Sequence, residues 1–163
     1  MRIFFGCFLT PTAARELMDR APEVPGLRPV PVENLHVTLH FLGSVAADRA
    51  EDVRVLAAGL PAVSLCASVR EITGFPKPGR ARMLVARLTD PDGQLGHWHE
   101  ALARGWPTGE KRRYDPHVTL GRSRYPVKLP MMPALNGVAL ELEPPAAYVS
   151  DTLPEGARYR RLG

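Results

Sequence analysis

The sequence predicts an α+β domain with antiparallel sheets, and three observations lead to this class. Strand-like and helix-like segments alternate along 163 residues, a length that suffices for one self-supporting core. The 17 prolines and 14 glycines are spread between these segments, so no linker divides the chain into separate domains. The tetrapeptide HVTL occurs at residues 36–39 and again at 117–120, which places one copy in each half of the fold.

The first half of the chain is predicted to contain two strands and two helices. RIFFGCFL (2–9) is almost wholly apolar, as is typical of a buried strand, and PTAARELMDRA (11–21) favours a helix. NLHVTLHFLG (34–43) alternates apolar and polar residues, which is the period-two pattern of a strand with one packed face. Residues 46–60 favour a second helix.

The second half is predicted to begin with a hairpin, whose strands at 63–75 and 81–88 are joined by the turn PKPGR (76–80). Residues 91–105 favour a third helix. The second HVTL then opens a strand directly after Pro116, which biases the preceding residue to an extended conformation. Closing strands are expected at 137–143, 147–153 and 157–162.

The amino-acid composition indicates which ligands the protein favours and which cellular compartment it occupies. Lys and Arg number 21 against 17 Asp and Glu, so the formal charge of +4 favours anionic ligands without requiring one. Two cysteines, Cys7 and Cys66, are too few for a disulfide framework and too far apart in sequence for a zinc motif. We expect two reduced, buried thiols, with a single bridge between them as the alternative. The apolar stretch Ile3–Leu9 is short for a signal peptide, and no run could cross a membrane, so we expect a soluble, cytoplasmic protein.

Each HVTL strand projects an imidazole and a hydroxyl side by side. Residues i and i+2 of a strand share a face, so His36 lies beside Thr38 and His117 beside Thr119. One His-x-Thr pair alone is most often a solvated strand face. Two pairs facing one cleft suit displacement at phosphorus, because one imidazole can remove a proton from the attacking oxygen while the other protonates the departing oxygen.

The sequence resembles the 2H phosphoesterases, and within them the RNA 2',3'-cyclic phosphodiesterases that are also called 2'-5' RNA ligases. Besides the two HVTL motifs, the resemblance covers most of the chain, from the strand-like opening to the final Gly-x-x-Tyr stretch. It is carried by RIFFGCFL (2–9), RPVPVENLHVTLHFLG (28–43), GFPKP (74–78), YDPHVTLGR (114–122) and YVSDTLPEGARYRRL (148–162).

The resemblance implies a fold and an activity. The fold is a single domain over residues 1–163, made of two lobes with pseudo-twofold symmetry, whose two antiparallel sheets line a central cleft with helices outside. The activity is hydrolysis of RNA 2',3'-cyclic phosphate ends to 2'-phosphate ends, with possible 2'-5' ligation. By analogy His36 is the acid, His117 is the base, and Thr38 and Thr119 bind the phosphate. A monomer that requires no metal and no cofactor is expected.

Three further residues are expected to bind substrate. Arg122 matches an arginine often found after the second motif, but strict alternation puts it on the wrong face unless a bulge at Gly121 turns it around. His40, where many relatives have lysine, shares the alternating face of His36, although an idle exposed position is equally compatible. Phe75 could stack a base or simply pack in a hairpin.

Several alternatives stay open. The basic run Lys111, Arg112 and Arg113 could draw in RNA or be a solvated face, and Tyr114 could stack or pack. The site would equally serve other cyclic or 2'-5' linked nucleotides, or an RNA-end-binding protein without catalysis. His97 and His99 suggest a metal hydrolase only weakly, because their spacing from the other histidines matches no compact ligand motif.

Overall fold

The computed structural model describes all 163 residues, which form nine strands and three α-helices. The helices are α1 (Pro11–Arg20), α2 (Ala50–Ala58) and α3 (Gln94–Gly105). The strands are β1 (Arg2–Phe8), β2 (Arg28–Pro29), β3 (His36–Ser44), β4 (Leu65–Phe75), β5 (Ala81–Thr89), β6 (His117–Val127), β7 (Ala139–Leu142), β8 (Ala146–Leu153) and β9 (Gly156–Arg161).

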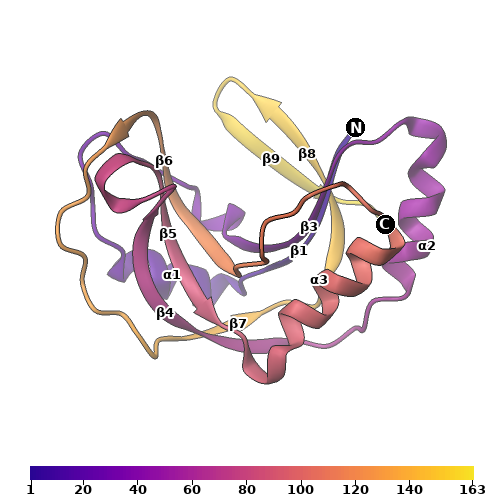
Figure 1. The fold of residues 1–163 in the computed structure, drawn as a ribbon, viewed down its shortest axis with the longest axis horizontal. Helices are drawn as coiled ribbons and strands as arrows, with labels where there is room; N and C mark the ends of the chain where they lie inside the picture. Colours follow the sequence, from indigo (N-terminus) through magenta and orange to yellow (C-terminus); the bar gives the residue numbers. More distant parts are fainter.

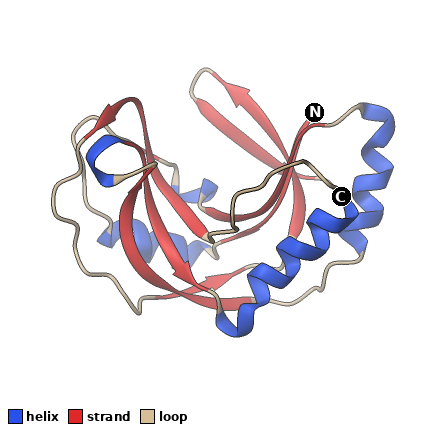
Figure 2. Ribbon diagram, viewed as in Figure 1, coloured by secondary structure: helices blue, strands red, loops and turns tan.

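The strands curl into an antiparallel half-barrel with the helices on its outside (Figures 1 and 2). Along the sheet the order is β7-β4-β5-β6-β3-β1-β8-β9, and β2 pairs with β6. This order divides into two four-stranded halves, each with one motif strand, β6 or β3, innermost. The halves meet at a single residue pair, Val37 opposite Val118, so the two expected sheets are joined edge to edge into one.

The predicted elements agree with the observed ones to within a few residues. The expected helices at 46–60 and 91–105 each begin as a 3₁₀ turn before the α-helix starts. The two-residue strand β2 was not expected, because its pairing with β6 depends on partners about ninety positions away and leaves no periodic pattern. No helix is long and apolar enough to cross a membrane.

One continuous core holds the two halves together and fixes the motif strands from behind. On β1 the side chains of Ile3, Phe5 and Cys7 are fully buried in this core. Helix α1 adds Leu17 after starting at Thr10, whose hydroxyl accepts a hydrogen bond from the Ala13 backbone N–H at 3.4 Å. Burial raises the pKa of the Cys7 thiol to about 12, which makes it an inert core group.

The expectation that both cysteines are buried is wrong for Cys66. Both are free thiols, but the Cys66 side chain is exposed. It lies near the start of β4 on the side of the strand that alternates away from the buried Ala67.

Candidate active site

The register at the junction of the two halves brings the two motifs together. Val37 and Val118 form the single pair between β3 and β6, and both side chains are fully buried on the core face. Their neighbours therefore point to the opposite face, where His36 lies across from Thr119 and Thr38 across from His117. Diagonal neighbours in such a pair are about 7–8 Å apart, so the two imidazoles can reach one phosphate between them.

Both imidazoles are held in the same tautomer by the backbone. The Nδ1 of His36 lies 2.7 Å from the carbonyl oxygen of Asn34, and the Nδ1 of His117 lies 2.8 Å from the carbonyl oxygen of Asp115. A carbonyl oxygen can only accept a hydrogen bond, so each Nδ1 carries the proton and donates it. Each Nε2 is thereby left free for proton exchange at the cleft.

The surroundings of the two histidines differ. The ring of His36 has centroids of Phe4, Phe8 and Tyr159 at 4.9, 5.0 and 5.0 Å. Burial lowers the pKa of His36 to about 4 against the opposing hydrogen bond to Asn34, and the positive charges of Arg122 and His117 lower it further. In the ligand-free protein His36 is therefore neutral at pH 7.

His117 has one aromatic neighbour and an ion-pair network beside it. Its ring meets the ring of Phe75 edge to face at 4.9 Å. Across the sheet it pairs with Arg87 of β5, whose guanidinium lies 2.8 Å from Glu71 and 3.2 Å from Asp115. Phe75 is thus placed at the second motif, as a substrate-binding aromatic would need to be.

A bulge in β6 brings Arg122 to the cleft. Thr119 pairs with Val85, but Gly121 pairs with Leu84, so one extra residue is inserted after the motif and the alternation changes phase. Arg122 then lies on the face of His117. A larger residue at 121 would also be crowded, because a Cβ there would lie 3.3 Å from the carbonyl oxygen of Arg28 on the adjoining β2.

A matching bulge occurs in β3, and His40 there is a buried residue at the wall of the cleft. Thr38 pairs with Gly6 while His40 pairs with Phe5, so strict alternation again fails after the motif. The His40 side chain is only 6% exposed, and its Nε2 donates to the carbonyl oxygen of Trp106 at 2.7 Å. His40 anchors the end of α3 to β3, and the exposed side chain at this point is Phe41.

Two side chains hold β3 from the other half of the chain, Tyr114 from the segment before β6 and His99 from α3. The Tyr114 hydroxyl donates to the Thr38 carbonyl oxygen at 2.9 Å, and the Nδ1 of His99 lies 2.6 Å from the Leu39 carbonyl oxygen. The two rings stack at 4.4 Å with an interplanar angle of 8°. Because the halves share only one backbone pair, these contacts help to fix the spacing of the motifs. The sequence predicts for Tyr114 only a stacking or packing role, because a hydrogen bond to a residue 76 positions away leaves no local pattern.

A cleft of about 1100 Å³ opens over the site. Its walls include Thr38, His117, Phe75 and Arg122, together with Arg112 and Arg113 of the basic run. Arg112 is held by Glu110 at 2.9 Å, whereas Lys111 does not line the cleft. No three His, Cys, Asp or Glu side chains are grouped as metal ligands, and His40 and His99 each spend one ring nitrogen on a backbone carbonyl.

The fold and the paired His-x-Thr strands define a protein of the two-histidine phosphoesterase class. The chain belongs to the 2'-5' RNA ligase superfamily, whose family model matches residues 10–151. A curated relative in Thermus thermophilus, named RNA 2',3'-cyclic phosphodiesterase, is 28% identical over 99% of this chain and 88% of its own length. One of the same name in Aeropyrum pernix is 28% identical over 65% of this chain, which spans 62% of that relative.

Solved structures confirm the fold. The crystal structure of TT0787 of Thermus thermophilus superposes with a TM-score of 0.82 at 27% identity, covering 100% of this chain and 96% of the other. The structure of E. coli LigT complexed with 3'-AMP gives a TM-score of 0.77 at 22% identity, over 99% and 95% of the two chains.

Proposed function

We propose that the protein hydrolyses the 2',3'-cyclic phosphate at RNA ends to a 2'-phosphate, with His36 and His117 as acid and base. The observation that supports this proposal is the pairing of Val37 with Val118, because the alternation of both strands then gives His36, Thr38, His117 and Thr119 the same face of the sheet. The names of the two curated relatives support the substrate class.

In the reaction a bond from water oxygen to phosphorus replaces the bond from phosphorus to the 3'-oxygen. His117 Nε2 takes a proton from the attacking water as its oxygen bonds to phosphorus, and the bond from phosphorus to the 3'-oxygen breaks. The His36 imidazolium gives its proton to that oxygen. Thr38 and Thr119 donate hydrogen bonds to the non-bridging oxygens, where charge grows in the transition state. A 5'-hydroxyl in place of water would give a 2'-5' bond.

The acid role requires the substrate to change the protonation of His36. The pKa of about 4 keeps this imidazole neutral in the free protein, chiefly because it is buried and to a smaller degree because of the charge of Arg122. A bound phosphate anion adds an opposite charge within a few ångströms, which favours the imidazolium.

We therefore expect the pKa of His36, followed by NMR of its ring nitrogens, to be near 4 in the free protein and higher with inorganic phosphate bound. Since the folded pKa lies below the usual 6.5, His36 also makes folding stability fall as the pH drops from about 6.5 toward 4. A pKa unchanged by phosphate would contradict the acid role, and His36 would then be the better candidate for the base.

The direct test is incubation of the protein with an RNA oligomer that ends in a 2',3'-cyclic phosphate. We expect a 2'-phosphate product, in the presence of EDTA as well as in its absence. A 3'-phosphate would reverse the assignment of the leaving oxygen, and loss of turnover with EDTA would indicate a metal-dependent reaction. Binding of the RNA end without product would leave a binding protein, and faster turnover of 2'-5' oligoadenylate would indicate another substrate.

A further inference from the structure

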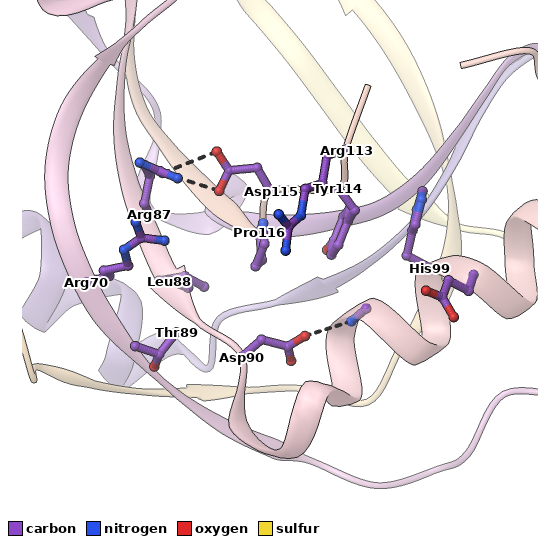
Figure 3. Close-up of a pocket in the computed structure, with 12 residues that line it drawn as sticks. Arg70, Arg87, Leu88, Thr89, Asp90, His99, Arg113, Tyr114, Asp115 and Pro116 are labelled. Atoms are coloured by element: carbon purple, nitrogen blue, oxygen red, sulfur yellow. Dashed lines mark hydrogen bonds and ion pairs between the residues drawn. The ribbon is translucent and has the colours of Figure 1, made fainter. Parts of the chain in front are cut away.

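A second cavity of about 990 Å³, drawn in Figure 3, shares Tyr114 and Asp115 with the wall of the catalytic cleft. Its walls come from the β4–β5 hairpin, the first turns of α3 and the segment before β6. Three arginines line it, one from each of β4, β5 and that segment, namely Arg70, Arg87 and Arg113. The proposed reaction at the cyclic phosphate does not use this cavity.

The three arginines of this cavity face three carboxylates, Asp90, Glu100 and Asp115, and two of these carboxylates already have hydrogen-bond or ion-pair partners. Asp90 accepts hydrogen bonds from the backbone N–H groups at the start of α3, at 2.7 and 2.9 Å. Asp115 is engaged by Arg87, which also holds Glu71 on its outer side. Arg70 and Arg113 have no ion pair, and Glu100 is the one lining carboxylate without a partner. Two guanidinium groups are therefore available to an anion.

The position of Arg70 follows from an irregularity in the hairpin. Val69 pairs with Leu88 and Glu71 with Arg87, so Arg70 is skipped in the register and makes no cross-strand pair. Such a bulge re-aims the side chain of the extra residue. The exposed Arg70 side chain lines the cavity together with Thr89, which supplies a hydroxyl.

The cavity is continuous with the catalytic cleft. Tyr114 and Asp115 line both, and so do His99 and Arg113. Arg87 sits directly across from His117, at the Cα separation of about 4.5–5.5 Å that antiparallel neighbours have. Arg70 and Arg113 line the same cavity as Arg87, so an anion held by those two would lie near the phosphate at the two histidines.

We propose that this cavity binds a backbone phosphodiester of the RNA chain upstream of the terminal cyclic phosphate. The inference rests on the proposed function and makes an oligonucleotide, not a mononucleotide, the preferred substrate. Guanidinium forks match the oxygens of a phosphodiester. A polynucleotide also supplies a second phosphate at a fixed distance from the first, which a cyclic mononucleotide lacks.

The test compares 2',3'-cyclic AMP with a dinucleotide that ends in a 2',3'-cyclic phosphate, using wild type and Arg70→Gln. We expect Arg70→Gln to raise KM for the dinucleotide about tenfold and to leave the mononucleotide unchanged. The slope of log(kcat/KM) against log salt for the dinucleotide should fall by about 0.7, the value for one phosphate contact on a single strand. Arg15→Gln, which removes an exposed arginine from α1 on the outside of the sheet, is the matched control.

Binding of the 2'-phosphate products, measured by calorimetry, separates this inference from the proposed function. If wild type turns over neither substrate but the dinucleotide product binds in an Arg70-dependent manner, the proposed function fails and the phosphodiester site stands. Equal losses for both substrates, or none for either, would overturn the site. It would also be overturned if inorganic phosphate bound in an Arg70-dependent manner while the dinucleotide gained nothing over the mononucleotide, because the cavity would then hold a free anion.

Discussion

Replacing either His36 or His117 with alanine should lower kcat/KM for RNA ending in a 2',3'-cyclic phosphate by about 10²–10⁴-fold, the usual contribution of general acid–base catalysis. In each histidine Nδ1 is bonded to a backbone carbonyl and only Nε2 is free to exchange a proton. The remaining histidine therefore cannot perform both proton transfers when the other is replaced. The measurement is steady-state turnover across a pH range, where wild type should show a bell-shaped profile.

His97→Ala is the control, because His97 is an exposed histidine on α3 that lines neither cavity. Thermal unfolding separates chemistry from folding, which matters for His36 because its ring packs against Phe4 and Phe8. A second variant, His36→Gln, also removes the titrating group but leaves a smaller cavity beside Phe4 and Phe8 than alanine does. The double replacement should cost little more than one alone, since the two groups act as a unit. Full activity in any single variant would refute the two-histidine mechanism.

Local sequence patterns predict most of the helices and strands of this fold. The period-two alternation around each HVTL and the proline and glycine punctuation predicted nearly every strand to within a few residues, because one packed face is a property of a few neighbouring residues. Such patterns cannot predict that Val37 pairs with Val118, because the two residues are 81 positions apart in the sequence. That pair decides whether the two motifs form one site.

After a β-bulge, the alternation of residues along a strand no longer predicts which face of the sheet a side chain occupies. At Gly121 the glycine gave a local reason to suspect a bulge, and the register bears this out. At Leu39 no such residue marks the matching bulge, so the sequence pattern could not show that His40, which lines the cleft, would be buried and hydrogen-bonded to Trp106. The hydrogen bond from Tyr114 to Thr38 was also inaccessible to pattern analysis, because it joins residues 76 positions apart.

Replacing Arg122 with alanine should lower kcat/KM for the cyclic-phosphate RNA by about 10²-fold, the cost of removing one donor to developing negative charge. The bulge places this guanidinium on the cleft face, where one of its Nη atoms lies 3.2 Å from the Met83 sulfur and its charge acts on both His36 and Tyr159. Lysine at this position should recover only part of the loss, since it cannot hold two phosphate oxygens in a fixed fork.

The same replacement has a second expected effect that a purely structural role would not produce. Because the positive charge of Arg122 lowers the pKa of His36, Arg122→Ala should raise that pKa in the free protein, as read from the ring nitrogens by NMR. Arg124→Ala, which removes an exposed arginine two residues further along β6, should change neither quantity. If Arg122→Ala moves the pKa but leaves kcat/KM intact, Arg122 tunes the acid without binding the phosphate. If kcat/KM falls and the pKa stays constant, the arginine acts on the phosphate alone, and the electrostatic link between it and His36 is wrong.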